Sequence, residues 1–309
     1  MTTMWDFVIE DGILRRYIGE ETDVVIPEGV KCVGSESFEG RVLLTSVTVP
    51  AGVTTIASGA FRGCTALERV ELCEGLVHVG VGAFRSCTSL REIVLPESVE
   101  WIESGAFEDC TALETVTLPA RATDMGRGVF MGCAALTHVS VPYGVKQIAP
   151  RTFSGCASLL DVVLPNSLQH IDNSAFADCT ALESVVIPDS VMFIDSWAFS
   201  GCTALSEVVI PAGVMMIFDH AFDHCTSLTY VELPDSVTNL DSYLFSGCAS
   251  LSSVVLPDSV TSIGHGVFES CTSLRSVIIP DSVTSVGDCV FQNCTALENV
   301  TAPRGLFVA

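Results

Sequence analysis

The fold is set by a motif whose clearest copy is residues 182–202, which read LESVVIPDSVMFIDSWAFSGC. Val185 and Ile187 are separated by one residue, and this alternation is the pattern of a short strand with an inner and an outer side. Pro188 ends the strand, because proline cannot donate to a sheet and fixes the turn that follows. The AFSGC segment at residues 198–202 predicts a single helical or 3₁₀ turn that closes the coil. Neither half can bury its own apolar side, so the motif requires neighbouring copies.

Phenylalanine recurs in this motif every 23 residues without an insertion or deletion. Cysteine follows three residues later from Cys64 to Cys294, leucine three residues after that, and a proline column is interrupted only at Cys73. A fixed period of this length is the signature of a repeat array. We therefore predict one repeat solenoid of twelve 23-residue coils, with a parallel β-sheet on the inner face and short strands or 3₁₀ turns on the outer face. The phenylalanine column consists of Phe38, Phe61, Phe84, Phe107, Phe130, Phe153, Phe176, Phe199, Phe222, Phe245, Phe268 and Phe291.

The repeat resembles the BspA-like, or treponemal-type, class of leucine-rich repeats. The pattern Leu-x-x-Val-x-Leu-Pro-x-Ser-Val-x-x-Ile-Gly-x-x-Ala-Phe-x-x-Cys-Thr-Ser is nearly complete at residues 251–273, and the match covers residues 27–302. The resemblance implies a right-handed, curved solenoid with the parallel sheet on its inner face. Members of this family that occur as surface proteins are associated with adhesion to host matrix proteins and with bacterial co-aggregation. The family has no catalytic motif to transfer.

The two ends of the array differ from its middle. Residues 1–26 are predicted to form an N-terminal β-hairpin cap with a type I′ turn at Asp11 and Gly12. Residues 27–302 form the twelve repeats, and residues 303–309 are a short, apolar C-terminal tail. Such a tail covers the last coil poorly, so either the natural protein continues or this end meets another chain, as in an end-to-end homodimer through the C-terminal coil.

The cysteines are regular enough to argue against a disulfide framework. Eleven of the fourteen share one register and are interpreted as small, buried side chains with free thiols. Cys32 and Cys289 fall at variable positions, and we expect them to be exposed and reactive.

The net charge of −23 limits the choice of partners. Between residues 152 and 274 there are 14 Asp or Glu and no Lys or Arg, so nucleic acid and anionic membranes are poor candidates. The acidity also has a simpler interpretation, namely that it keeps an apolar solenoid in solution. Residues 1–10 lack the pattern of a signal peptide, which predicts a cytoplasmic protein; the alternative is a cell-surface or secreted protein whose signal lies outside the given sequence.

Catalytic, cofactor and metal signatures are weak. The variable positions of a regular solenoid lie on open surface, and no phosphate-binding loop, GxSxG elbow or paired CxxC motif occurs, so we predict neither an enzyme nor a cofactor. His220 and His224 have the i, i+4 spacing of zinc ligands, with Asp219 and Asp223 beside them, but exposed turn residues are the favoured interpretation. A column of one aspartate per coil could hold calcium loosely. That column consists of Asp172, Asp195 and Asp241.

Large apolar residues replace small or polar ones at several variable positions between residues 192 and 243. These columns lie beside the core residues of the second half-coil, so their side chains should face outward. Clusters of aromatic residues and Met on a surface usually mark an interface, whereas the alternative is that they fold onto the coil edge and complete local packing. The candidate residues, here named the Trp197 patch, are Met192, Phe193, Trp197, Met215, Met216, Phe218, His220 and Tyr243.

The outer positions of the strands on the inner sheet form a competing site. They carry an apolar stripe flanked by polar residues, although β-branched residues favour strands for conformational reasons alone. The candidates on this sheet are His138, Asp161, Val163, Val186, Glu207, Val209 and Tyr230. The sequence thus predicts a non-catalytic scaffold for a protein partner of unknown identity, using the Trp197 patch, the inner sheet or both; the alternative is an exported adhesin that binds host matrix or other cells.

Overall fold

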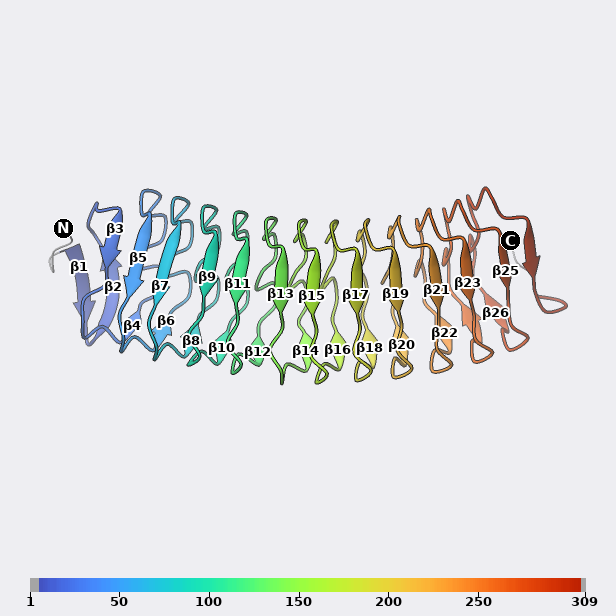
Figure 1. Ribbon diagram of the computed structural model, residues 1–309, viewed down its shortest axis with the longest axis horizontal. Helices are drawn as coiled ribbons and strands as arrows, with labels where there is room; N and C mark the ends of the chain where they lie inside the picture. The colour runs from blue at the N-terminus through green and yellow to red at the C-terminus, as the bar shows by residue number, and fades with distance from the viewer. Residues whose placement is uncertain (1–5, 307–309) are drawn as a thin grey trace. The chain divides into compact units, whose positions relative to one another are not determined.

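The computed structural model describes residues 6–306, and within this range the chain consists of strands and turns without an α-helix (Figure 1). Each 23-residue coil contributes one long strand of three or four residues and one short strand of two residues. The chain divides into a first unit, residues 1–145 with 155–159, and a second unit, residues 146–154 with 160–309. The first five residues of the predicted cap and the last three of the predicted tail lie outside the described residues.

The first unit begins with a β-hairpin. Strands β1 (Phe7–Glu10) and β2 (Ile13–Tyr17) pair antiparallel. The turn between them has positive φ at Asp11 (50°) and Gly12 (76°), as a type I′ turn requires. Strand β2 then pairs in parallel with β4 (Cys32–Val33), so the hairpin leads directly into the first coil.

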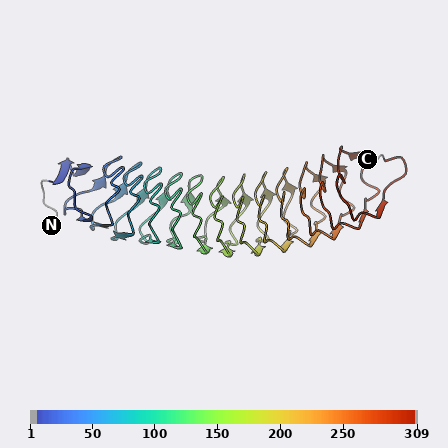
Figure 2. The same ribbon diagram turned by 90° about the horizontal axis from the view of Figure 1, so that it is seen from above.

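Parallel strands stack through the rest of the first unit in steps of 23 residues, as seen from above in Figure 2. Its long strands are β3 (Asp23–Val25), β5 (Ser46–Val49), β7 (Arg69–Leu72), β9 (Glu92–Val94), β11 (Thr115–Thr117) and β13 (His138–Ser140). Its short strands, which continue the sheet from β4, are β6 (Thr55–Ile56), β8 (His78–Val79), β10 (Trp101–Ile102) and β12 (Asp124–Met125).

The second unit repeats this arrangement. Among its long strands, β17 to β23 form one parallel sheet and the last two form another. These long strands are β15 (Asp161–Val163), β17 (Ser184–Val186), β19 (Glu207–Val209), β21 (Tyr230–Glu232), β23 (Ser253–Val255), β25 (Ser276–Ile278) and β27 (Asn299–Thr301). Its short strands are β14 (Gln147–Ile148), β16 (His170–Ile171), β18 (Phe193–Ile194), β20 (Met216–Ile217), β22 (Asn239–Leu240), β24 (Ser262–Ile263) and β26 (Ser285–Val286).

The interior of each unit is a set of residue ladders. The middle residue of each long strand from β13 to β25 is buried and its two neighbours are exposed, because successive side chains of a strand point to opposite faces. Phenylalanines one coil apart stack face to face, with ring centroids 5.3 Å apart for Phe84–Phe107 and 5.4 Å apart for Phe199–Phe222. Burying each ring stabilises the fold by about 1.5–3 kcal/mol before chain entropy is counted. Both units are therefore β-solenoids with the predicted interior.

The segment that closes each coil differs from its predicted form. Instead of short 3₁₀ helices, the residues around the phenylalanine column form single turns, such as those closed by the bonds from Ala198 N–H to Asp195 O and from Cys202 N–H to Phe199 O. A helix cannot continue here because Trp197 and Gly201 both have positive φ, 56° and 74°. The prediction of a 3₁₀ element in this segment was wrong for this reason.

Candidate functional site

Three aromatic side chains of the Trp197 patch form a stack in the second unit. Trp197, His220 and Tyr243 occupy the same position of consecutive coils, with ring centroids 5.0 Å and 4.8 Å apart. We name these three residues the aromatic column. Their stacking is worth about 0.5–1.5 kcal/mol per contact.

The backbone of the aromatic column is in an unusual conformation. All three residues have φ between 56° and 59°, a region that side chains other than glycine rarely adopt. Five other coils carry glycine at the same position. Placing a bulky residue there costs on the order of 1 kcal/mol, and such strain concentrates at functional sites. The equivalent glycines are Gly59, Gly82, Gly105, Gly128 and Gly266.

The remaining residues of the Trp197 patch lie on and around β18 and β20. Trp197, Met215 and Met216 are 39%, 54% and 43% exposed. The other five predicted residues are only partly exposed, because they pack on each other and on neighbouring side chains. Phe193, for example, stacks on His170 with centroids 4.9 Å apart. The partly exposed members are Met192, Phe193, Phe218, His220 and Tyr243.

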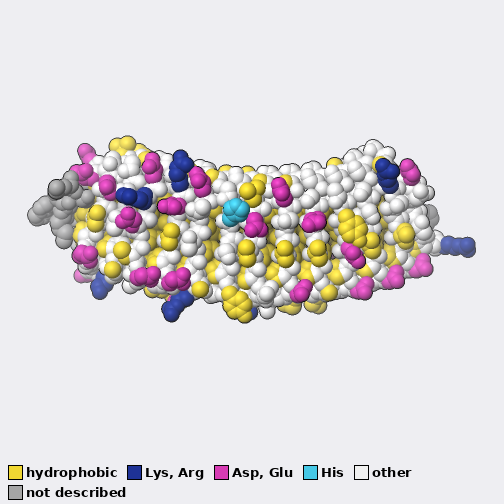
Figure 3. Space-filling model, in the orientation of Figure 1, with side chains coloured by type: hydrophobic (Ala, Val, Ile, Leu, Met, Phe, Trp, Pro, Cys, Tyr) yellow, Lys and Arg dark blue, Asp and Glu magenta, His cyan; other side chains and the backbone are white. Residues whose placement is uncertain are grey.

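The candidates of the inner sheet lie on the outer positions of the long strands. Val186 and Val209 are 82% and 77% exposed. The Tyr230 hydroxyl donates to the Glu232 carboxylate at 3.1 Å, and this bond raises the pKa of Tyr230. His138 lies on β13 in the first unit, whereas Asp161, Val163, Glu207 and the three residues just named lie in the second. Hydrophobic side chains form a visible row over the long strands in Figure 3.

The histidine pair has an acidic partner between its members. Asp223 contacts both rings, with its carboxylate oxygens 3.3 Å from His220 Nδ1 and 2.7 Å from His224 Nδ1. In the part of the chain that the structure describes, no three His, Cys, Asp or Glu side chains converge as a metal site would require. The two histidines and Asp223 form a local hydrogen-bonded group at the edge of the aromatic column.

The aspartate column is interrupted. Phe218 occupies the coil position between Asp195 and Asp241. Burial, followed by the nearby charge of Asp219, raises the pKa of Asp241. Asp219 and Asp241 line an open hollow of about 440 Å³ together with Ser242. The hollow is polar, and its two carboxylates repel each other.

The cysteine column is a hydrogen-bonded ladder as well as an apolar one. Each thiol donates to the carbonyl oxygen of the phenylalanine one coil earlier, as in Cys87 to Phe61 (3.2 Å) and Cys225 to Phe199 (3.2 Å). All fourteen cysteines of the chain are free. The sequence shows the spacing but not this bond, because the bond depends on how one coil is set against the next.

Burial makes these thiols poor nucleophiles. It raises the pKa of Cys110, Cys156 and Cys202 to about 12, and the thiolate is the reactive form. Cys32 is half-buried and its pKa is raised for the same reason, which corrects the expectation that it is an exposed, reactive thiol. Cys289 is exposed, as expected.

One exposed tryptophan was missed in the sequence. Trp101 on β10 is 45% exposed and occupies the same coil position as Phe193 and Met216, but in the first unit. Beside it, His78 Nε2 lies 2.8 Å from the Glu103 carboxylate. The 23-residue register would have identified Trp101 if the first unit had been searched for the same column.

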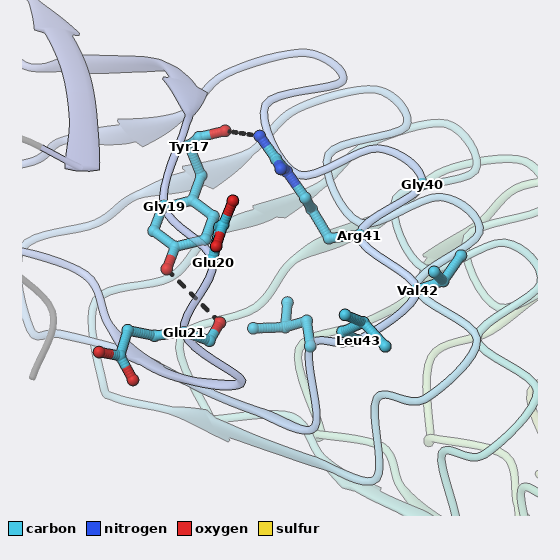
Figure 4. A pocket seen from close by; sticks show the side chains of 9 residues that line it. Tyr17, Gly19, Glu20, Glu21, Gly40, Arg41, Val42 and Leu43 are labelled. Atoms are coloured by element: carbon cyan, nitrogen blue, oxygen red, sulfur yellow. Dashed lines mark hydrogen bonds between the residues drawn. The ribbon is translucent and has the colours of Figure 1, made fainter.

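A second feature of the first unit is a hollow of about 420 Å³ next to the hairpin (Figure 4). Arg41 stands there at the coil position that carries cysteine in later coils. Its guanidinium donates to the Tyr17 carbonyl and lies 5.5 Å from the centroid of the Tyr17 ring. The Tyr17 ring in turn stacks on Phe38 at 5.0 Å. Tyr17 and Arg41 thus continue the aromatic and cysteine ladders to the end of the unit, and Leu43 remains 70% exposed at the rim.

The comparisons with known proteins agree with this geometry. A family model described as BspA type leucine rich repeat region matches residues 17–137, 77–206, 123–251 and 198–308. The chain belongs to the BspA-type leucine-rich repeat family. No curated protein gives a significant match to this BspA-type chain.

Several solved structures resemble it. A leucine-rich repeat protein from Bacteroides ovatus is 29% identical, with a TM-score of 0.77 over 99% of this chain and 87% of that one. A leucine rich cell surface protein from Faecalibacterium prausnitzii is 28% identical, with a TM-score of 0.59 over 96% and 92% of the two chains. The leucine-rich repeat protein of Treponema pallidum is 35% identical, with a TM-score of 0.56 over 59% and 90%. Within the described residues of this BspA-type array, no helix is long and apolar enough to span a membrane.

Proposed function

We propose that this chain is a non-catalytic protein-binding scaffold whose binding surface lies on the second unit. The observation that carries the proposal is the aromatic column. Trp197, His220 and Tyr243 adopt a backbone conformation that glycine adopts in other coils, and yet the Trp197 ring stays 39% exposed. A strained, exposed aromatic group has little value for the core and is typical of a contact surface.

The surroundings of the column support this function. Met215 and Met216 extend the apolar surface next to it, and Met adapts to partners of different shape. The family consists of repeat solenoids, which offer wide, open surfaces rather than the enclosed, water-excluding pockets that catalysis uses.

Affinity capture tests the proposal. The intact chain serves as bait in a lysate of the source organism, next to a Trp197→Ala/Met216→Ser variant. Trp101→Ala is the matched control, because it removes a tryptophan of similar exposure from the first unit. We expect the specific partner to be lost with the double variant and kept with the control. Equal capture by all three proteins would contradict the proposal.

A second candidate function is adhesion at the cell surface. It is favoured by the similarity to the F. prausnitzii protein, which is described as a cell surface protein and is 28% identical over nearly the whole chain. The test is the location of the full-length gene product in intact cells. Digestion by an added protease that cannot enter the cell would support this function, and full protection would exclude it.

A further inference from the structure

A continuous line of exposed apolar side chains crosses the long strands of the second unit. It is formed by the third residues of β15, β17, β19, β23 and β25, and only β21 interrupts it, with Glu232. We name this line the apolar row. Single exposed valines are normal on strands, but a row that recurs at every coil makes a connected surface. Its members are Val163, Val186, Val209, Val255 and Ile278.

Carboxylates lie on both sides of the apolar row. On one side, Asp161, Glu183 and Glu207 stand at or just before the first position of the strands, and all three are exposed. On the other side, the turn after the strand carries an exposed aspartate in four coils. These turn residues are Asp189, Asp235, Asp258 and Asp281.

This face holds few cations of its own. From residue 152 to residue 274 the chain contains no Lys or Arg. The equivalent face of the first unit is different, because Arg91 next to β9 pairs with Glu114 at 2.9 Å and Arg69 on β7 lies 3.8 Å from Glu71. The carboxylates beside the apolar row therefore attract cations from outside the chain.

The backbone of this face is already engaged. Strands β17, β19, β21 and β23 are hydrogen-bonded to one another in that order. A partner on top of them meets side chains rather than free N–H and C=O groups, so it cannot bind by adding a strand to these four. Its affinity must come from apolar contact in the row and from charge at the edges.

We propose that the apolar row and its flanking carboxylates bind a polypeptide segment in which Lys or Arg accompanies aliphatic side chains. The aliphatic groups cover the row, and the long stems of Lys and Arg lie along apolar surface while their charged ends reach the carboxylates. Nucleic acid and anionic lipid carry the wrong charge for this face. The proposal rests on the protein-binding function of the second unit and names the chemistry of one partner segment.

Fluorescence anisotropy with synthetic peptides tests the chemistry. The full chain is titrated into a labelled peptide that alternates Lys with Val and Thr, into one with Glu in place of every Lys, and into one with Ser in place of every Val. We expect binding of the Lys-Val peptide that weakens as salt is added, no binding of the Glu peptide, and about tenfold weaker binding of the Ser peptide. Absence of saturable binding, or equal binding of the Lys and Glu peptides, would overturn the proposal.

Matched variants test the location. Val186→Ser/Val209→Ser should lower the affinity for the Lys-Val peptide by about tenfold or more. The same change at Val25 and Val94, which are both 58% exposed at the third position of their strands in the first unit, should leave it unchanged. Asp189→Asn/Asp235→Asn should weaken binding, unlike Glu74→Gln/Glu97→Gln at the same turn of the first unit. Equal losses in the two units would place the peptide elsewhere and overturn the proposal.

The result is separable from the scaffold function. Capture that depends on Trp197, together with a failure of the Lys-Val peptide, would keep the scaffold and remove the basic segment as its partner. Specific binding of the peptide to the apolar row, with capture unaffected by Trp197→Ala/Met216→Ser, would keep the basic segment and remove the Trp197 patch.

Discussion

Arginines of the first unit reach across neighbouring coils to carboxylates, as Arg62 does to Glu36 (3.1 Å) and Arg85 does to Glu108 (2.8 Å). In the second unit the stretch from residue 152 to 274 has 14 carboxylates and no Lys or Arg, and the ion pairs described there are made by His220 and His224 with Asp223. The same 23-residue motif therefore carries a self-neutralised surface in one unit and an anionic, partly apolar surface in the other. Since the interiors match, the difference belongs to binding rather than to folding.

The largest expected effect concerns the interior that the two units share. Burial raises the pKa of the ladder thiols, to about 12 for Cys110, Cys156 and Cys202, whereas an unfolded chain has a cysteine pKa of about 8.5. The stability from keeping these thiols neutral is complete below the unfolded value and is lost as pH rises toward the folded value. Each such thiol should lower the free energy of unfolding by about 1.4 kcal/mol per pH unit in that window.

Urea unfolding at a series of pH values measures this loss. We expect a flat profile near neutral pH and a steep fall above about pH 9, and hydrogen exchange should show the fall in both units. A stability that is constant up to about pH 10.5 would contradict the buried thiol ladder.

Removing one ring from the phenylalanine column should cost the same in either unit. Phe84 and Phe199 are both fully buried between two stacked neighbours at 5.1–5.4 Å. Phe84→Ala and Phe199→Ala should each reduce the free energy of unfolding by about 3–5 kcal/mol, measured by urea titration. A difference between them larger than about 1.5 kcal/mol would show that the interiors are not equivalent.

Much of the fold could be predicted because the period decides which side chains face inward. The phenylalanine, cysteine and leucine columns lie in the core, as a residue's place in the motif requires. The turns that close the coils could not be predicted, because positive φ at Trp197 is set by the coil geometry and not by the side chain. Glycine at the same position of five other coils was the only signal of that conformation in the sequence.

The candidate site was predictable in location but not in exposure. The register placed Met215, Met216 and Trp197 on the surface, and they are exposed. Phe193 is partly covered by His170, a contact between neighbouring coils that a search for large apolar residues does not reveal. Whether these residues bind a partner stays a prediction.

Exchanging the aromatic column with its glycine equivalent sharpens the comparison at a smaller scale. Trp197→Gly removes one stacking contact but also relieves the positive φ, so stability should change by less than about 1 kcal/mol while partner capture is lost. Gly105→Trp in the first unit, where φ is 61°, gains no aromatic neighbour and should cost about 1–2 kcal/mol. Urea titration and affinity capture measure the two effects, and a large destabilisation by Trp197→Gly would indicate a role in folding.

The smallest effect is expected from giving the second unit an arginine like that of the first. Ser206 stands one coil after Glu183 and at the position that Arg91 occupies next to β9. Ser206→Arg should add about 0.2–1 kcal/mol of stability at low salt, because exposed ion pairs contribute little. It should also weaken binding of the Lys-Val peptide, and Ser206→Gln is the uncharged control. Tighter binding by the arginine variant would contradict the charge argument.

The central claim is that binding lies on the second unit, and valine methyl NMR tests it most directly. The full chain with labelled valine methyls is titrated with the unlabelled Lys-Val peptide. We predict that the signals of Val163, Val186 and Val209 shift while those of Val25 and Val94 stay in place. Shifts confined to Val25 and Val94, or shifts of similar size in both units, would contradict the account.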